Sequence, residues 1–96
     1  SVALISKFAI MEFKYGTPER GRTIFEEILA NYPKRVDIWN MYLDQETSIF
    51  AQNFDSMSPA EKKKVNRVQR LFNRVISLKF SSKKMKFFFN LFYIFL

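Results

Sequence analysis

The chain of 96 residues contains neither cysteine nor histidine, so it lacks the side chains that most familiar catalytic and metal sites require. Zinc sites with cysteine or histidine ligands, Ser-His-Asp triads and Cys-His nucleophile pairs are therefore excluded. Two carboxylate pairs remain, but Glu26 and Glu27 point about 100° apart on a helix and cannot flank one substrate bond. Asp44 with Glu46 has no geometry that supports a hydrolase. The sequence predicts a protein that is not an enzyme and that uses no cofactor or metal.

The segment from Gly16 to Gly21, Gly-Thr-Pro-Glu-Arg-Gly, shares two glycines with phosphate-binding loops. It lacks the third glycine or the Gly-Lys-Ser/Thr ending of such loops, and it follows no strand. Thr17 suits a helix N-cap and Pro18 the first helical position. We interpret the segment as a turn between two helices.

Basic residues concentrate in the second part of the chain and indicate an anionic partner. Residues 1–61 hold all nine acidic residues and six basic ones, whereas residues 62–96 hold ten basic residues and no acidic one. RNA phosphates and an acidic protein surface both fit this pattern. A solvated basic face also fits this pattern, with the acidic residues that compensate its charge in sequence outside this chain. The candidates for contact with RNA or a partner are Lys63, Arg67, Arg70, Arg74, Lys83, Lys84 and Lys86.

Four helices are predicted from apolar residues at steps of three and four. They cover residues 3–15, 18–31, 36–46 and 59–78, and residues 47–60 are expected to form a loop. Along the last of these helices, Lys63, Arg67, Arg70 and Arg74 would form one basic stripe. Trp39 and Tyr42 could stack on bases, as aromatic residues do in single-strand binders, but their spacing favours packing in the core.

The segment after residue 82 is apolar almost all round. Residues 86–96 are too few to cross a bilayer as a helix, which takes about twenty residues. We expect a helix that is covered by a neighbour, with no role in a membrane. The fold class is then all-α, with about five helices stacked as antiparallel pairs.

The helices repeat along the chain. The first, third and fifth helices align on a shared pattern: an apolar or aromatic residue, a second one three positions later and an acidic residue four positions after that. The fifth helix lacks the acidic residue. The second and fourth helices align through the core positions Ile24 with Leu71 and Phe25 with Phe72. The aligned first-helix positions are Ile5, Phe8 and Glu12; Trp39, Tyr42 and Glu46; and Phe89, Phe92 and Leu96. We expect the first two of these sets, together with the aligned second-helix positions, to form the core of the repeat.

Trp39 follows Ile5 by 34 residues, which is the length of a tetratricopeptide unit. The pattern W-x-x-Y-x-x-x-E in the first helix and R-x-I-F-E or R-x-L-F-N in the second resembles the half-a-tetratricopeptide (HAT) repeat instead. We divide the chain into a first repeat at residues 1–33, a second at 34–80 with an insertion at 47–60, and the first helix of a third at 81–96.

Residues 5–46 and 70–89 further resemble the C-terminal HAT region of the ribosomal RNA processing protein 5 family, also called the programmed cell death protein 11 family. The resemblance implies a nuclear and nucleolar scaffold that works in pre-rRNA processing and small-subunit assembly. Its expected partners are ribosome-assembly proteins, the remainder of a longer chain and pre-rRNA, with no small-molecule substrate. The insertion at 47–60 and the apolar residues 90–96 depart from the family pattern.

Overall fold

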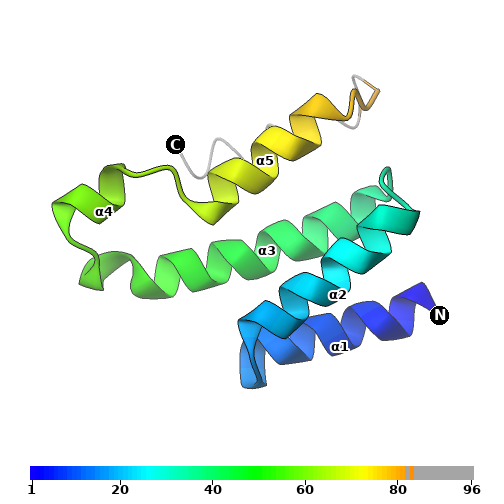
Figure 1. Cartoon of the computed structure of the whole chain (residues 1–96), viewed down its shortest axis with the longest axis horizontal. Helices are drawn as coiled ribbons and strands as arrows, with labels where there is room; N and C mark the ends of the chain where they lie inside the picture. Colours follow the sequence, from blue (N-terminus) through cyan, green and yellow to red (C-terminus); the bar gives the residue numbers. More distant parts are fainter. Residues whose placement is uncertain (82, 84–96) are drawn as a thin grey trace.

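The computed structural model describes residues 1–81 and residue 83, and this part of the chain is all-α, as predicted (Figure 1). Its elements follow one another through short turns. They are α1 (Val2–Tyr15), α2 (Pro18–Asn31), α3 (Val36–Asn53), a 3-10 turn η1 (Phe54–Ser56), α4 (Pro59–Lys63) and α5 (Arg67–Ser77). Among the described residues, no helix is both long and apolar enough to span a bilayer.

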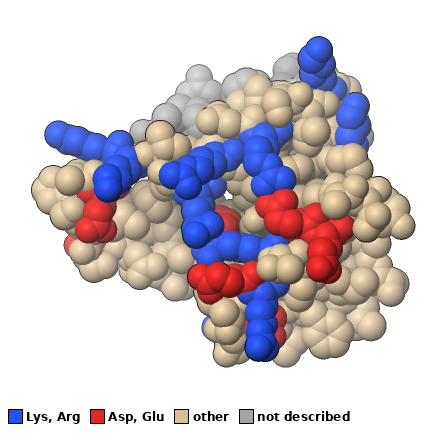
Figure 2. Space-filling model, viewed as in Figure 1, with Lys and Arg blue, Asp and Glu red and all other residues tan. Residues whose placement is uncertain are grey.

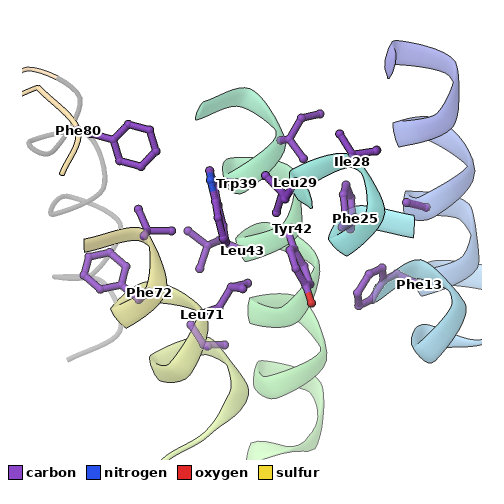
Figure 3. Close-up of a cluster of buried hydrophobic side chains, with 14 residues drawn as sticks. Phe13, Phe25, Ile28, Leu29, Trp39, Tyr42, Leu43, Leu71, Phe72 and Phe80 are labelled. Carbon is purple, nitrogen blue, oxygen red and sulfur yellow. The ribbon is translucent and has the colours of Figure 1, made fainter. Parts of the chain in front are cut away.

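Helix α3 lies between α2 on one side and α5 on the other, and successive long helices run antiparallel (Figure 1). The core follows this order, with side chains of α5 on one flank of α3 and side chains of α2 and α1 on the other (Figure 3). Phe25 and Phe72 are almost completely buried. Each such side chain contributes about 1.5–3 kcal/mol through its removal from water.

The crossing of α1 and α2 depends on small residues. Ala9 is fully buried in α1, and Gly21 of α2 lies directly against Phe13. A Cβ at Gly21 would approach the Phe13 ring and would stand 2.8 Å from the carbonyl oxygen of Ala9. The backbones of the two helices can approach this closely only because residue 21 has no side chain.

The boundaries of α3 and of the following helices differ from the sequence prediction. Helix α3 continues to Asn53 through half of the expected loop, and Ile49 and Phe50 of this extension pack against the core. The predicted helix at 59–78 is two helices. A new helix, α5, begins at Arg67 because Asn66 caps it: the Asn66 side chain accepts from the Gln69 backbone N–H, and the Gln69 side chain accepts from the Asn66 backbone N–H.

Smaller features of the turns also differ from expectation. Thr17 makes no side-chain cap; its backbone N–H instead donates to the Glu12 carboxylate at 3.1 Å. Val65 would lie on the apolar face of the predicted helix at 59–78, but it is 56% exposed because it lies in the linker between α4 and α5.

The residues predicted as the repeat core fall into two groups. Most of them are buried or partly buried: Glu12, Ile24, Phe25, Trp39, Tyr42, Glu46, Leu71 and Phe72. Ile5 and Phe8, in contrast, are 43% and 56% exposed, which corrects the expectation that they are core residues. The inward face of α1 carries Ser6, Ala9 and Phe13 in their place. Phe89, Phe92 and Leu96 lie outside the described residues.

Replacement of Gly21 by alanine is expected to destabilise the fold by about 1–3 kcal/mol, because overpacking at the crossing outweighs the better helix propensity of alanine. Urea denaturation followed by circular dichroism measures this loss. Gly16→Ala is the matched control: its added Cβ meets chiefly the end of the flexible Glu12 side chain, so its loss should be smaller. Equal stability of Gly21→Ala and the unchanged chain would contradict the close crossing.

Candidate functional site

The predicted basic row is divided between two helices. Lys63 is the last residue of α4, whereas Arg67, Arg70 and Arg74 lie on α5. All four are exposed. A single continuous stripe is therefore not formed, because the linker at residues 64–66 separates Lys63 from the three arginines. Lys83 is also exposed, and Lys84 and Lys86 lie outside the described residues.

Arg74 of α5 connects this helix to α2 and α3. Its guanidinium donates to both carboxylate oxygens of Glu26 on α2, at 2.6 and 2.8 Å, and its Cζ lies 5.2 Å from the ring centroid of Trp39. A two-pronged contact of this kind is stronger than a single hydrogen bond, and the ring adds a cation–π contribution. Arg74 is thus engaged by its own chain.

Glu26 joins three helices through one carboxylate. Besides Arg74 of α5, it accepts a hydrogen bond of 2.9 Å from the Tyr42 hydroxyl of α3. The Arg74 guanidinium is the main reason that the pKa of Glu26 lies below its usual range, although partial burial opposes this effect. Burial and the neighbouring Glu26 carboxylate raise the pKa of Tyr42, so its hydroxyl stays protonated as a donor.

A second ion pair, Arg22 with Glu46, joins α2 to α3. Nε and Nη2 of Arg22 donate to the two oxygens of Glu46, each at 2.8 Å, and the Glu46 side chain is only 4% exposed. Its hydrogen bonds to Glu46 are the main reason that the pKa of Arg22 is raised. Glu46 is therefore bound by Arg22 and enclosed between α2 and α3.

Arg22 was missed as a functional position by sequence reasoning. A signal was present, because Glu46 occupies a predicted buried position and α3 carries no lysine or arginine one turn away from it. A buried carboxylate needs a cationic partner, and that partner had to come from another helix.

The resulting surface carries both signs of charge. A shallow hollow is lined by Arg22, Glu26, Glu27 and Arg67, together with Thr23, Ala30 and Tyr42. Basic side chains form a band over this face, and acidic side chains lie directly beside it (Figure 2). Within the described part of the chain, no group of three or more acidic residues is placed to hold a metal ion.

Comparison with known proteins shows relatives along nearly the whole chain. It is 49% identical over 93% of its length to the rRNA biogenesis protein rrp5 of Schizosaccharomyces pombe. It is 42% identical over 95% of its length to the rRNA biogenesis protein RRP5 of Arabidopsis thaliana, and 39% identical over 93% to the Protein RRP5 homolog of Homo sapiens. The chain spans about 4% of the length of each of these relatives. No family model matches it.

Glu46→Ala is expected to cost about 3 kcal/mol of stability, because it leaves the Arg22 guanidinium partly buried without its partner. The double change Arg22→Met with Glu46→Leu should cost less than the single change, since both charges are removed together. Urea denaturation of Arg22→Met, Glu46→Leu and the double variant completes the cycle. Strictly additive losses would show that the two side chains do not interact.

The Glu26 ion pair should make stability depend on pH. Because the folded pKa of Glu26 is lowered, its contribution is fully present above the ordinary value of 4.5 and is lost as the pH falls below that value through the folded pKa. Glu26→Gln should therefore be less stable than the unchanged chain at neutral pH, and the difference should shrink as the pH falls below 4.5.

Denaturation of both proteins across this range measures the difference directly. The pKa of Asp37 is also lowered, chiefly by its hydrogen bonds with Arg35, and burial raises that of Asp44. Both groups are present in each protein, so their effects cancel in the comparison. A gap that stays constant with pH would contradict the role given to Glu26.

Proposed function

Because this chain belongs, as a short segment, to the RRP5 family of rRNA biogenesis proteins, we propose that it is a non-catalytic helical-repeat scaffold in rRNA biogenesis. The observation that carries this proposal is the identity of 39–49% along nearly the entire chain with proteins from yeast, plant and human. The names of the relatives from Schizosaccharomyces pombe and Arabidopsis thaliana state a process and no chemical reaction, which supports a binding role.

On this proposal the protein works in the nucleus, in the nucleolus, during pre-rRNA processing and small-subunit assembly. Its partners are ribosome-assembly proteins. We also propose the repeat division at residues 1–33 and 34–80, which is supported by the start of α1 at Val2 and of α3 at Val36. Residues 81–96 would begin a third repeat.

The mixed charge of the face between α2 and α5 supports a protein partner. Glu26 and Glu46 already neutralise Arg74 and Arg22, and Glu27 stands exposed beside them. Phosphates would be repelled by these carboxylates, whereas protein surfaces present both signs of charge and polar groups. We therefore give the scaffold preference over a surface that binds RNA alone.

Direct RNA binding is the second candidate. Lys63, Arg67 and Arg70 are exposed, and the described residues contain no ion pair that occupies them. Such residues could contact phosphates in a manner that is sensitive to salt and tolerant of sequence. Arg74 is a weaker candidate than the sequence indicated, because Glu26 holds it.

Charge reversal at Lys63, Arg67 and Arg70 separates the two functions. For a scaffold, replacing these residues by glutamate should leave pre-rRNA affinity unchanged but reduce the recovery of co-purified assembly proteins by about tenfold, since a like charge at an interface costs more than 1.4 kcal/mol. RNA titrations at about 50 mM and 200 mM salt and quantitative co-purification give the two readouts.

Reversal of Lys7, Lys14 and Lys34 is the matched control, because it alters the net charge equally at exposed positions outside α4 and α5. The scaffold proposal fails if the first triple variant loses RNA while its protein partners stay bound. It also fails if the control variant loses the partners to the same extent, because the effect would then follow net charge alone.

A further inference from the structure

Helix α1 has a second apolar face that no described residue covers. Leu4, Ile5, Phe8 and Met11 lie on it at helical spacing, and they are 55%, 43%, 56% and 55% exposed. We call these four residues the α1 stripe. The opposite face of α1, with Ala9 and Phe13, is already buried against α2. A helix that is apolar on two sides has surface for two neighbours.

The same positions are buried in α3. Leu4, Ile5 and Phe8 correspond to Ile38, Trp39 and Tyr42, which follow them by 34 residues and are only 1%, 2% and 4% exposed. The register is independently marked by the helix starts, since α1 begins at Val2 and α3 at Val36. The surroundings of α3 therefore show what a covered stripe looks like.

Helix α2 covers these α3 positions with an arginine and an aromatic residue three positions apart. Phe25 stacks on Tyr42 with 5.1 Å between ring centroids, and Arg22 binds both oxygens of Glu46. In α1 the equivalents of Tyr42 and Glu46 are Phe8 and Glu12. Among the described residues, the Glu12 carboxylate accepts a hydrogen bond from the Thr17 N–H but takes part in no ion pair.

The charge beside the stripe selects the kind of partner. A shallow hollow next to Glu12 is also lined by Glu19, Glu27 and Ile24, with Arg20 as its single basic residue. Three carboxylates around an apolar surface repel phosphates and attract a cationic side chain. The partner should be apolar on one face and basic on its flank.

We propose that the α1 stripe binds an amphipathic helix that carries an arginine three residues before an aromatic residue. The arginine pairs with Glu12 and the aromatic ring packs on Phe8, as Arg22 and Phe25 of α2 do with Glu46 and Tyr42. This inference rests on the internal equivalence of α1 and α3, and it does not depend on the proposed role in rRNA biogenesis.

A synthetic peptide with the sequence of residues 17–34 is a suitable probe, because it carries Arg22 and Phe25 at the required spacing. A fluorescently labelled peptide should bind the intact chain saturably in an anisotropy titration. Phe8→Ala should weaken this binding at least about tenfold, as expected for an aromatic anchor. Tyr32→Ala is the matched control: Tyr32 is a similarly exposed aromatic residue outside the stripe, and its loss should leave the affinity unchanged.

A charge exchange tests the register. Glu12→Arg in the chain should weaken binding of the unchanged peptide, and a peptide with Arg22→Glu should restore it. Circular dichroism of each chain variant shows whether the helices persist, and exposed positions such as Phe8 and Leu4 should tolerate substitution.

Four results would overturn the proposal. The first is no saturable binding to the folded, unchanged chain. The second is equal binding by the Phe8→Ala variant, because the peptide would then occupy another site. The third is failure of the exchanged charges to restore affinity. The fourth is that another occupant covers the stripe. The chain would then self-associate in sedimentation or bind phosphatidylserine vesicles, and Phe8→Ala would abolish that association while peptide binding persists.

Discussion

Burial of α3 on two opposite sides is the constraint on which the described structure depends. Trp39 and Tyr42 lie one turn apart and are nearly inaccessible, with α2 on one flank and α5 on the other (Figure 3). The indole N–H donates to the Pro33 carbonyl oxygen at 2.7 Å, which fixes the turn that leads into α3. With α3 held in this way, the remaining helices have defined places against it, and the core can extend from Phe13 to Phe72.

Two glutamates make this packing specific. Glu26 and Glu46 each bind an arginine through two hydrogen bonds, and in both cases the partner comes from another helix. A partly buried charge is costly unless it is paired, so these contacts disfavour other registers of the helices. The acidic first part of the chain and the basic second part thus compensate each other at Glu26 and Arg74. Lys63, Arg67 and Arg70 belong to the excess positive charge that remains in the second part.

Helix α1 carries the same residue pattern as α3, but one of its apolar faces is uncovered. Glu12, Phe8 and Ile5 occupy the positions that Glu46, Tyr42 and Trp39 occupy in α3, but Phe8 and Ile5 are exposed, and no described helix covers these two. Their exposure therefore depends on which helix lies beside them and says little about residue type, because the same pattern is buried 34 positions later. In such arrays each unit completes the surface of the next.

Sequence alone determined the all-α class, the turn between α1 and α2 and the 34-residue spacing, because these follow from local periodicity and recurring residues. The kinship with rRNA biogenesis proteins rests on sequence identity along nearly the whole chain. It also identified Phe25, Trp39, Tyr42 and Phe72, which the structure buries. Tertiary structure alone decided that Arg74 binds Glu26, that Arg22 binds Glu46 and that Ile5 and Phe8 are exposed. These outcomes depend on which helices are neighbours. A periodic pattern shows which face of a helix is apolar, but it does not show which helix packs on that face.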